Sequence, residues 1–340
     1  MQKEQSITID GRPVTFETGE TILQVARRAG IGIPTLCFLK EAGPTGACRI
    51  CLVEVEGART LVAACAAPAA PDMVVTTNSE RVIRSRRLNL ELLLSSGHHY
   101  CVTCEADGDC RLQDLAYACG IDTIRFPETP PRYPVEFNTL INRDFSRCIM
   151  CGRCVQACND IQVNNAISYG YRGGESKIVA RGDRPYNDSD CVFCGECVQR
   201  CPVGALVPAG SRFKGKSRQL KKVRTTCGYC GVGCQVELQV NSLKNQVVRI
   251  NGVESAGPNF GSLCVKGRFG YDFINDNGRL KTPLVRKNGS LQPVSWEEAL
   301  DAAAGGLGKI KDSCGPDAVG VLTSARITNE ENYLAQKFAR

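Results

Sequence analysis

The 340-residue sequence contains little of several residue types, and these shortages exclude some classes of chemistry. It has two histidines, His98 and His99, one tryptophan and three methionines, and aromatic residues make up 6% of the chain. We find no complete combination of nucleophile, histidine and acid that would predict a catalytic triad. No G-x-G-x-x-G sequence follows a strand-like run, and no other flavin or nicotinamide signature is present. The sequence therefore predicts neither acid–base catalysis nor a nucleotide site of its own.

Long apolar segments and targeting signals are also missing. No window reaches about 18 consecutive apolar residues, so no membrane span is expected. Residues 2–5 are polar and precede a strand-like run, and no hydrophobic stretch follows Arg27-Arg28. Neither a secretory nor a twin-arginine signal is predicted, which favours a cytoplasmic location. Cysteine, by contrast, is abundant, with 21 residues. In a reducing cytoplasm, so many cysteines indicate metal ligands rather than disulfides.

The stretch from Cys148 to Cys201 contains two matching cysteine runs, CIMCGRCVQAC and CVFCGECVQRCP. Each run places cysteines at i, i+3, i+6 and i+10, the spacing of bacterial two-cluster ferredoxins. In that arrangement three close thiolates hold one cube and the fourth cysteine reaches the other. One [4Fe–4S] cluster is thus predicted to bind Cys148, Cys151, Cys154 and Cys201, and another Cys191, Cys194, Cys197 and Cys158. Two zinc sites are the alternative, which the eight matched cysteines disfavour.

Residues 1–78 contain four further cysteines in a segment that reads as mixed helix and sheet. Alternation in 6–16 around Asp10-Gly11 predicts a hairpin, residues 21–29 predict a helix, and 51–56 and 61–65 predict strands. The helix should bury Ile22, Leu23, Val25 and Ala26. The cysteines are separated by 10, 2 and 13 residues: Cys37, Cys48, Cys51 and Cys65. Four buried structural cysteines are the alternative to a [2Fe–2S] site.

This cysteine spacing resembles the N-terminal domain shared by three families. These are the largest iron–sulfur subunit of respiratory complex I, the [FeFe] hydrogenases and the NAD-linked formate dehydrogenases. The plant-type [2Fe–2S] spacing has a shorter first interval. The resemblance implies a ubiquitin-like domain over 1–78 in which Cys37, Cys48, Cys51 and Cys65 bind one [2Fe–2S] cluster.

Residues 79–126 should form a small helical domain that contains three cysteines and both histidines. A helix over 79–95 is predicted to turn Val82, Ile83, Leu88 and Leu92 inward. Cys101, Cys104 and Cys110 cannot complete a four-ligand site alone, and the same three families carry a [4Fe–4S] cluster here with one histidine and three cysteines. Their commonest histidine position is Gly97 in this chain, but some formate dehydrogenase-like members read Gly-x-His-x-Cys. That variant favours His99 as the ligand, with His98 second. Cys119 is expected to be a buried helical cysteine.

The segment 220–276 contains a fourth cysteine group: Cys227, Cys230, Cys234 and Cys264. The runs VELQV and QVVRI between these cysteines predict strands. The arrangement resembles the [4Fe–4S] domain that opens molybdenum- or tungsten-bis-pterin enzymes, formate dehydrogenases above all. The following Lys266 matches the lysine that in this family lies between the cluster and a pterin. A zinc ribbon is a weaker alternative because its second cysteine pair would be closer together.

Residues 277–340 continue this resemblance as the incomplete start of a molybdopterin-binding α/β domain. Ser295 and Glu298 predict a capping box, followed by a helix with an inner face of Leu300, Ala303, Leu307 and Ile310. Residues 319–322 predict a parallel strand, and NEENY opens another helix. Cys314 is expected in a loop and without a ligand role. A molybdenum or tungsten bis-pterin guanine dinucleotide is expected only together with the missing part of this domain.

Nineteen cysteines and His99 thus supply the twenty ligands of one [2Fe–2S] and four [4Fe–4S] clusters. The expected fold is α+β and multidomain, with a two-cluster ferredoxin domain over 138–210. Anionic clusters would add about −9 to the formal charge of +7. No nucleic-acid partner is therefore expected. The basic run should instead cover anionic clusters or link domains: Arg212, Lys214, Lys216, Arg218, Lys221, Lys222 and Arg224.

The whole length resembles the N-terminal part of the catalytic subunit of an NAD- or ferredoxin-linked formate dehydrogenase. This implies that electrons pass between a molybdenum- or tungsten-pterin site, where formate becomes CO2, and a partner that reacts with NAD or ferredoxin. Implied partners are a flavin- and NAD-binding iron–sulfur subunit, a small [2Fe–2S] subunit, ferredoxin and a pterin-containing chain. The alternative is a pure electron-transfer subunit of a hydrogenase or another NAD-linked complex.

Overall fold

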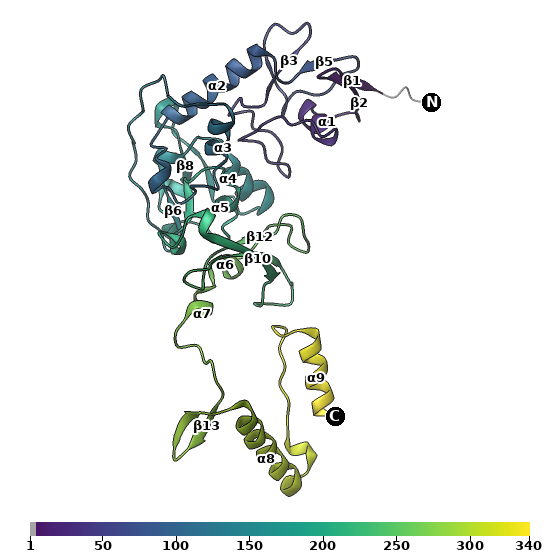
Figure 1. Ribbon diagram of the computed structural model, residues 1–340, viewed down its shortest axis with the longest axis vertical. Helices are drawn as coiled ribbons and strands as arrows, with labels where there is room; N and C mark the ends of the chain where they lie inside the picture. The colour runs from purple at the N-terminus through teal and green to yellow at the C-terminus, as the bar shows by residue number, and fades with distance from the viewer. Residues whose placement is uncertain (1–4) are drawn as a thin grey trace.

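The computed structural model describes residues 5–340, so the first four residues of the predicted domain 1–78 lie outside the described part. The protein is elongated, and its segments follow one another along the long axis (Figure 1). The N-terminal strands lie at one end, and the two C-terminal helices lie at the other. Within residues 5–340, no helix combines the length and the apolar composition that crossing a bilayer requires.

The N-terminal segment is a five-stranded mixed sheet in the order β2-β1-β5-β3-β4 with one helix packed on it. The predicted hairpin is confirmed, since β1 (Ser6–Ile9) pairs antiparallel with β2 (Arg12–Thr15). β1 also pairs parallel with β5 (Val74–Thr76), and β3 (Leu52–Val55) joins β5 to β4 (Val62–Ala63). Helix α1 (Ile22–Arg28) buries the four apolar residues that the sequence predicted, and a capping box at Thr21 starts it.

Helix α2 (Glu80–Ser95) forms where expected but turns a different face inward. Val82 is buried, whereas Ile83, Leu88 and Leu92 are exposed, so three of the four predicted inward residues are wrong. Arg86 explains the rotation, because its guanidinium donates to the carbonyl oxygens of Ile50, Leu52 and Thr77. These buried carbonyls need donors, and a single arginine supplies them. Helix α3 (Arg111–Ala118) follows and buries Leu112.

The segment with the two matching cysteine runs is held together by short elements. β6 (Ile141–Arg143) pairs with β9 (Leu206–Pro208), and helices α4 (Arg153–Gln156) and α5 (Glu196–Arg200) follow the two cysteine loops. A π-helical turn, Ala157–Ile161, extends α4. The hairpin expected between the runs is present as β7 (Ile167–Gly170) and β8 (Lys177–Ala180).

The next segment is a three-stranded antiparallel sheet followed by two short helices. β11 (Gln235–Asn241) and β12 (Gln246–Gly252) confirm the predicted strands, and β10 (Leu220–Thr226) adds an edge strand formed by the end of the basic run. Helices α6 (Val265–Phe269) and α7 (Asp272–Asn275) follow. Short 3-10 turns occupy residues 101–103, 145–147, 173–175, 181–183, 186–188, 209–211, 217–219 and 316–318.

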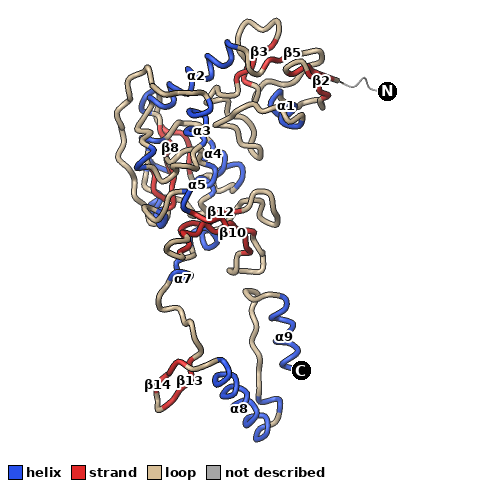
Figure 2. The backbone as a smooth tube through the Cα atoms, viewed as in Figure 1, coloured by secondary structure: helices blue, strands red, loops and turns tan. Residues whose placement is uncertain are grey.

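The C-terminal segment extends away from the rest and consists of a hairpin and two helices (Figure 2). β13 (Leu284–Lys287) pairs with β14 (Ser290–Pro293), and α8 (Trp296–Cys314) and α9 (Asn329–Ala339) follow. The predicted inner face of α8 is wrong for the described chain, since α8 has no buried residue and Leu300, Ala303, Leu307 and Ile310 are all exposed. The strand predicted over 319–322 is absent from the described structure, since an isolated strand has no partner for its backbone.

Two smaller expectations for α8 are also corrected. The Ser295 hydroxyl caps the helix by accepting from the Glu298 amide, but the Glu298 side chain does not complete the box. Its carboxylate instead forms an ion pair with Lys287 of the preceding hairpin. Cys314 is the last residue of the helix rather than part of a loop.

One hydrophobic cluster joins the first three segments and positions the candidate sites. It combines Leu36 and Ile50 of the first segment with Leu90 and Leu112 of α2 and α3. It also contains residues beside the matching cysteine runs: Ile149, Val203 and Ala205. These segments therefore share a continuous apolar core.

Candidate iron-sulfur centres

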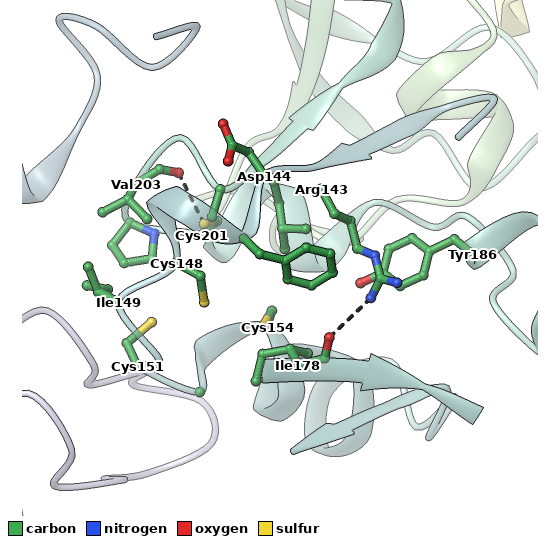
Figure 3. A pocket seen from close by; sticks show the side chains of 15 residues that line it. Arg143, Asp144, Cys148, Ile149, Cys151, Cys154, Ile178, Tyr186, Cys201 and Val203 are labelled. Atoms are coloured by element: carbon green, nitrogen blue, oxygen red, sulfur yellow. Dashed lines mark hydrogen bonds between the residues drawn. The ribbon is translucent and has the colours of Figure 1, made fainter. Parts of the chain in front are cut away.

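Four predicted ligands from both matching runs surround one cavity, which we call site A. Cys148, Cys151, Cys154 and Cys201 line a cavity of about 30 Å³ together with apolar side chains. Figure 3 shows these cysteines around a common space. Gly152 makes this loop possible, since its φ is +77° and an added Cβ would lie 2.0 Å from the Tyr169 hydroxyl. The structure thus brings Cys201, the fourth cysteine of the second run, beside the first three cysteines of the first run.

Site B consists of Cys158, Cys191, Cys194 and Cys197. Burial raises the pKa of the Cys197 thiol, and the charges of Cys194, Cys191 and Cys158 add to this effect, so the four groups are close in space. The π-helical turn after α4 carries Cys158 toward the second run. Its Sγ atom accepts a hydrogen bond from the amide of Ala166 at 3.4 Å. The crossed pairing expected for a two-cluster arrangement is therefore compatible with the geometry.

The two cysteine loops have nearly the same backbone. Met150 and Phe193 both have φ of +52°, and Gly152 and Gly195 have φ of +77° and +73°. The amide of Phe193 donates to the Sγ atom of Cys191 at 3.4 Å. Left-handed residues turn consecutive amides toward one side, which creates a pocket for an anionic group. Both loops are thus shaped to hold negative charge.

Cys37, Cys48, Cys51 and Cys65 are all buried in or beside the core of the first segment. A hydrogen bond from the Cys48 thiol lowers the pKa of Cys37, and one from the Cys65 thiol lowers the pKa of Cys51. Cys51 immediately precedes β3 and Cys65 lies two residues after β4, rather than within these strands. Four buried thiols from one loop and one sheet edge can surround a small metal cluster.

His99 and three cysteines line another cavity, of about 40 Å³, which we call the His99 site. It contains Cys101, Cys104 and Cys110, which are the cysteines predicted to need a fourth ligand. The Nε2 atom of His99 is buried and has no hydrogen-bond partner among the described residues. Burial lowers the pKa of His99, which favours the neutral imidazole that metals bind. The Nε2 atom of His98 instead contacts Glu128 at 3.2 Å. These environments favour His99 over His98.

Two residues that the sequence analysis did not single out individually shape the His99 site. Gly204 leaves room for a ligand, because an added Cβ would lie 2.4 Å from the Sγ atom of Cys104. Lys216 donates through Nζ to the carbonyl oxygens of Val102 at 2.9 Å and Cys104 at 2.7 Å. Lys216 is therefore a residue of the basic run that lies against a candidate cluster site, as one of the two expectations for this run requires. The sequence feature that could have identified Gly204 is its position in CPVGAL, three residues after the last cysteine of the second run.

Cys227, Cys230, Cys234 and Cys264 meet between β10, β11 and the start of α6. Burial raises the pKa of the Cys234 thiol, and the charges of Cys227, Cys230 and Cys264 add to this effect. Cys230 and Cys264 are exposed. Lys266 is exposed in the first turn of α6, two residues after Cys264. This site is thus the least covered of the cysteine groups.

Arg268 joins this segment to site B and was not identified from the sequence. The side chain is 1% exposed, and its Nε atom donates to the Cys194 carbonyl at 3.0 Å. It also donates to Gln199 at 2.6 Å and contacts Glu196 at 3.4 Å. Gly195 permits this approach, because an added Cβ would lie 2.2 Å from Cδ of Arg268. Arg268 therefore connects α6 directly to the second cysteine loop.

The donor sets fit iron–sulfur clusters, because each consists of four cysteines or of three cysteines and one histidine. Among residues 5–340, no three histidine, cysteine or acidic side chains are close enough to hold one ion. A mononuclear zinc site needs its sulfurs within about 2.3 Å of the metal. A cluster places metal and sulfide atoms between its thiolates, which therefore stand further apart. The Nε2 atom of His99, which is buried and has no hydrogen-bond partner among the described residues, is available to bind such a group.

Cys119 and Cys314 stand apart from these sites. Cys119 caps the C-terminus of α3 and packs at the edge of the shared hydrophobic cluster, partly rather than fully buried. Cys314 is exposed on α8. Neither lines the cavities of site A or the His99 site.

Five families match consecutive parts of the chain. Residues 2–80 match a 2Fe-2S iron-sulfur cluster binding domain, and residues 86–125 match the NADH-ubiquinone oxidoreductase-G iron-sulfur binding region. Residues 147–205 match a 4Fe-4S dicluster domain. Residues 220–276 match the Molybdopterin oxidoreductase Fe4S4 domain, and residues 279–340 match the Molybdopterin oxidoreductase family. The chain thus contains 2Fe-2S, 4Fe-4S and molybdopterin oxidoreductase domains.

Curated relatives are similar over almost the whole chain. NADPH-Fe(3+) oxidoreductase subunit alpha of Geobacter sulfurreducens is 39% identical over 336 residues, which are 98% of this chain and 39% of that protein. A G-type subunit of the NADH-quinone oxidoreductase of Rhizobium meliloti is 38% identical, over 98% of this chain and 38% of that protein. A Bacillus subtilis protein named "Putative formate dehydrogenase YrhE" is 35% identical, over 99% of this chain and 38% of that protein. The chain spans about two fifths of the length of these relatives.

A solved structure also matches, that of an NAD+-reducing [NiFe]-hydrogenase in the H2-reduced state. The TM-score is 0.60 at 35% identity, and the match covers 63% of this chain and 92% of that chain. The fold, the cysteine groups and these similarities agree with one another. The chain is thus an iron–sulfur oxidoreductase protein of the same family as the matched hydrogenase chain, and it is similar to a G-type subunit of an NADH-quinone oxidoreductase and to a protein named "Putative formate dehydrogenase YrhE".

Proposed function

We propose that the chain is a five-cluster electron path in a formate dehydrogenase-type oxidoreductase. One [2Fe–2S] cluster is held by Cys37, Cys48, Cys51 and Cys65, and [4Fe–4S] clusters are held at site A, at site B and at the His99 site. A last [4Fe–4S] cluster is held by Cys227, Cys230, Cys234 and Cys264. When bound, these clusters supply groups that accept and release single electrons. The assigned domains are 1–78, 79–126, 138–210, 220–276 and 277–340.

The observation that carries this proposal is the apolar core shared by three of the sites. A single hydrophobic cluster contains Cys37 and Cys48 of the first segment, Cys110 of the His99 site, and Cys148, Cys151 and Cys201 of site A. A second cluster contains cysteines of sites A and B together with Phe269 of α6, which follows Cys264. Cofactors bound in these positions would be neighbours in a water-poor interior. Site A lies at the junction, because its cysteines belong to both clusters.

The residues around the sites have defined tasks in such a path. Apolar side chains such as Ile149 and Val203 exclude water from site A. Backbone amides stabilise the thiolates, as the Phe193 amide does for Cys191. Lys216 fixes the loop that carries Cys101 and Cys104. By resemblance, Lys266 lies between the last cluster and a pterin and couples them. These arrangements set the positions and potentials of bound clusters rather than performing proton chemistry.

The finer function is the transfer of electrons from formate, at a molybdenum- or tungsten-pterin site, to an NAD- or ferredoxin-reactive partner. Lys266→Ala in the complete complex tests this direction of flow. We expect slower cluster reduction by formate and unchanged reduction by NADH, because only the pterin side depends on Lys266. Equal slowing with both donors would contradict the coupling role and indicate that Lys266 only supports folding.

A pure electron-transfer subunit of a hydrogenase is the second candidate. The similarity to an NAD+-reducing [NiFe]-hydrogenase favours it, since the match covers 92% of that chain. The two candidates differ in the donor that reduces the clusters within the native complex. Reduction by formate but not by H2, with molybdenum or tungsten present, supports the first, and reduction by H2 alone supports the second.

A further inference from the structure

Sites A and B differ in charge at one equivalent position. Their loops, 148–154 and 191–197, have matching backbone angles, and their sequences are CIMCGRC and CVFCGEC. The only exchange of charged residues is Arg153 for Glu196. The backbone amides of Arg153 and Glu196 each lie near the second cysteine of their own loop, Cys151 and Cys194. The two loops thus form a natural matched pair in which opposite charges occupy the same place.

Arg153 is a buried cation without an acidic partner. The residue is 5% exposed, and its Nε atom has no hydrogen-bond partner. Its guanidinium donates one 3.5 Å hydrogen bond, to the Leu36 carbonyl, and among residues 5–340 no carboxylate forms an ion pair with it. Arg153 immediately precedes Cys154 of site A, and it lines a cavity together with Cys201. Removing a guanidinium from water without a counter-charge is costly, so the anionic site A is its natural partner.

Glu196 is equally buried but fully paired. Its carboxylate accepts from Arg200 at 2.8 Å and contacts Arg268 at 3.4 Å. Arg200 is itself shared with Glu254 at 2.9 Å and with Glu41 at 3.5 Å. The three carboxylates and two guanidinium groups of this network leave no positive charge in excess. Site B therefore lacks the uncompensated cation that site A has.

We propose that Arg153 makes the cluster at site A the more easily reduced member of the pair, and that the Glu196 network keeps the cluster at site B at lower potential. This inference rests on the proposed function. Adding an electron makes a cluster more negative, and a nearby positive charge stabilises that state. Electrons that reach either cluster would then rest preferentially at site A. That position lies where the two hydrophobic clusters meet, beside the [2Fe–2S] site and the His99 site.

The test is a redox titration of the purified full chain, followed by the EPR signals of its reduced [4Fe–4S] clusters. Arg153→Gln should lower the ratio of reduced to oxidised cluster for one signal about tenfold at fixed potential, equivalent to about 59 mV. Arg153→Lys should restore most of this ratio, because it keeps the charge. Glu196→Gln should move a different signal, to higher potential. Arg218→Gln is the control, since this side chain is 70% exposed and should leave all signals in place.

The outcomes separate this inference from the proposed function. If Arg153→Gln keeps its iron but shifts no [4Fe–4S] signal by more than about twofold in that ratio, the inference is wrong while the cluster assignment stands. If Arg153→Gln loses iron, the Glu196→Gln variant tests the inference instead. The potential of the lower-potential [4Fe–4S] signal should then rise, and an unchanged potential would equally overturn the inference. A wild-type chain without iron or EPR signals would instead contradict the proposed function itself.

Discussion

Replacement of Arg268 by methionine is the most informative test of how the last cysteine segment is attached. The substitution removes a guanidinium that reaches from α6 into the second cysteine loop and bonds with Cys194, Gln199 and Glu196. Removing one partner of a buried ion pair typically costs about 3–5 kcal/mol. Glu196 keeps Arg200 as a partner at 2.8 Å, so we expect the lower end, about 3 kcal/mol.

Hydrogen exchange measures this loss locally, which suits a chain of several segments. A loss of about 3 kcal/mol corresponds to a decrease in amide protection on the order of a hundredfold. The decrease should appear in α6 and in α5, whereas the first sheet, β1–β5, keeps its protection. Arg218→Met is the matched control, because its ion pair with Asp107 is exposed and is worth at most about 1 kcal/mol. Protection in Arg268→Met within about twofold of the parent would refute this view of the junction.

Four further substitutions test the His99 site. His99→Ala should abolish or alter one [4Fe–4S] EPR signal, whereas His98→Ala, which removes the contacts with Glu128 and Tyr100, should leave it; the reverse pattern would assign the ligand to His98. Gly204→Val should lower the iron content by about one cluster, because the added side chain occupies the position of the Cys104 Sγ atom; full iron content would contradict this steric role. Lys216→Met should destabilise the same cluster by about 1–2 kcal/mol, seen as several-fold faster iron loss to a chelator, and an unchanged rate would mean that its hydrogen bonds are not required.

The sequence predicted those features that depend on local patterns. The hairpin at Asp10-Gly11, the buried face of α1 and the insert hairpin of β7 and β8 all follow from alternation, periodicity and turn residues. Ligand spacing is itself a sequence pattern, and the cysteines predicted for site A and for the His99 site each line one cavity, while the full ligand assignment stays a prediction. The geometry agrees with the preference for His99, whose imidazole is buried and unpartnered.

Features that depend on contacts between distant segments could not be predicted in this way. The face of α2 is set by Arg86 and by carbonyl groups more than thirty residues away, at Ile50 and Leu52. Lys216, Gly204 and Arg268 became visible only when the fold placed them beside the cysteine loops. Residues 319–322 have the composition of a strand, yet a strand forms only when a neighbouring strand can pair with it.

The central claim is that the cysteines bind iron–sulfur clusters, and direct metal analysis tests it most simply. The chain should be purified anaerobically and assayed for iron, acid-labile sulfide and zinc per polypeptide. One two-iron and four four-iron clusters predict about 18 irons per chain, with a similar amount of sulfide and negligible zinc. About eight irons per chain together with bound zinc would contradict the five-cluster account.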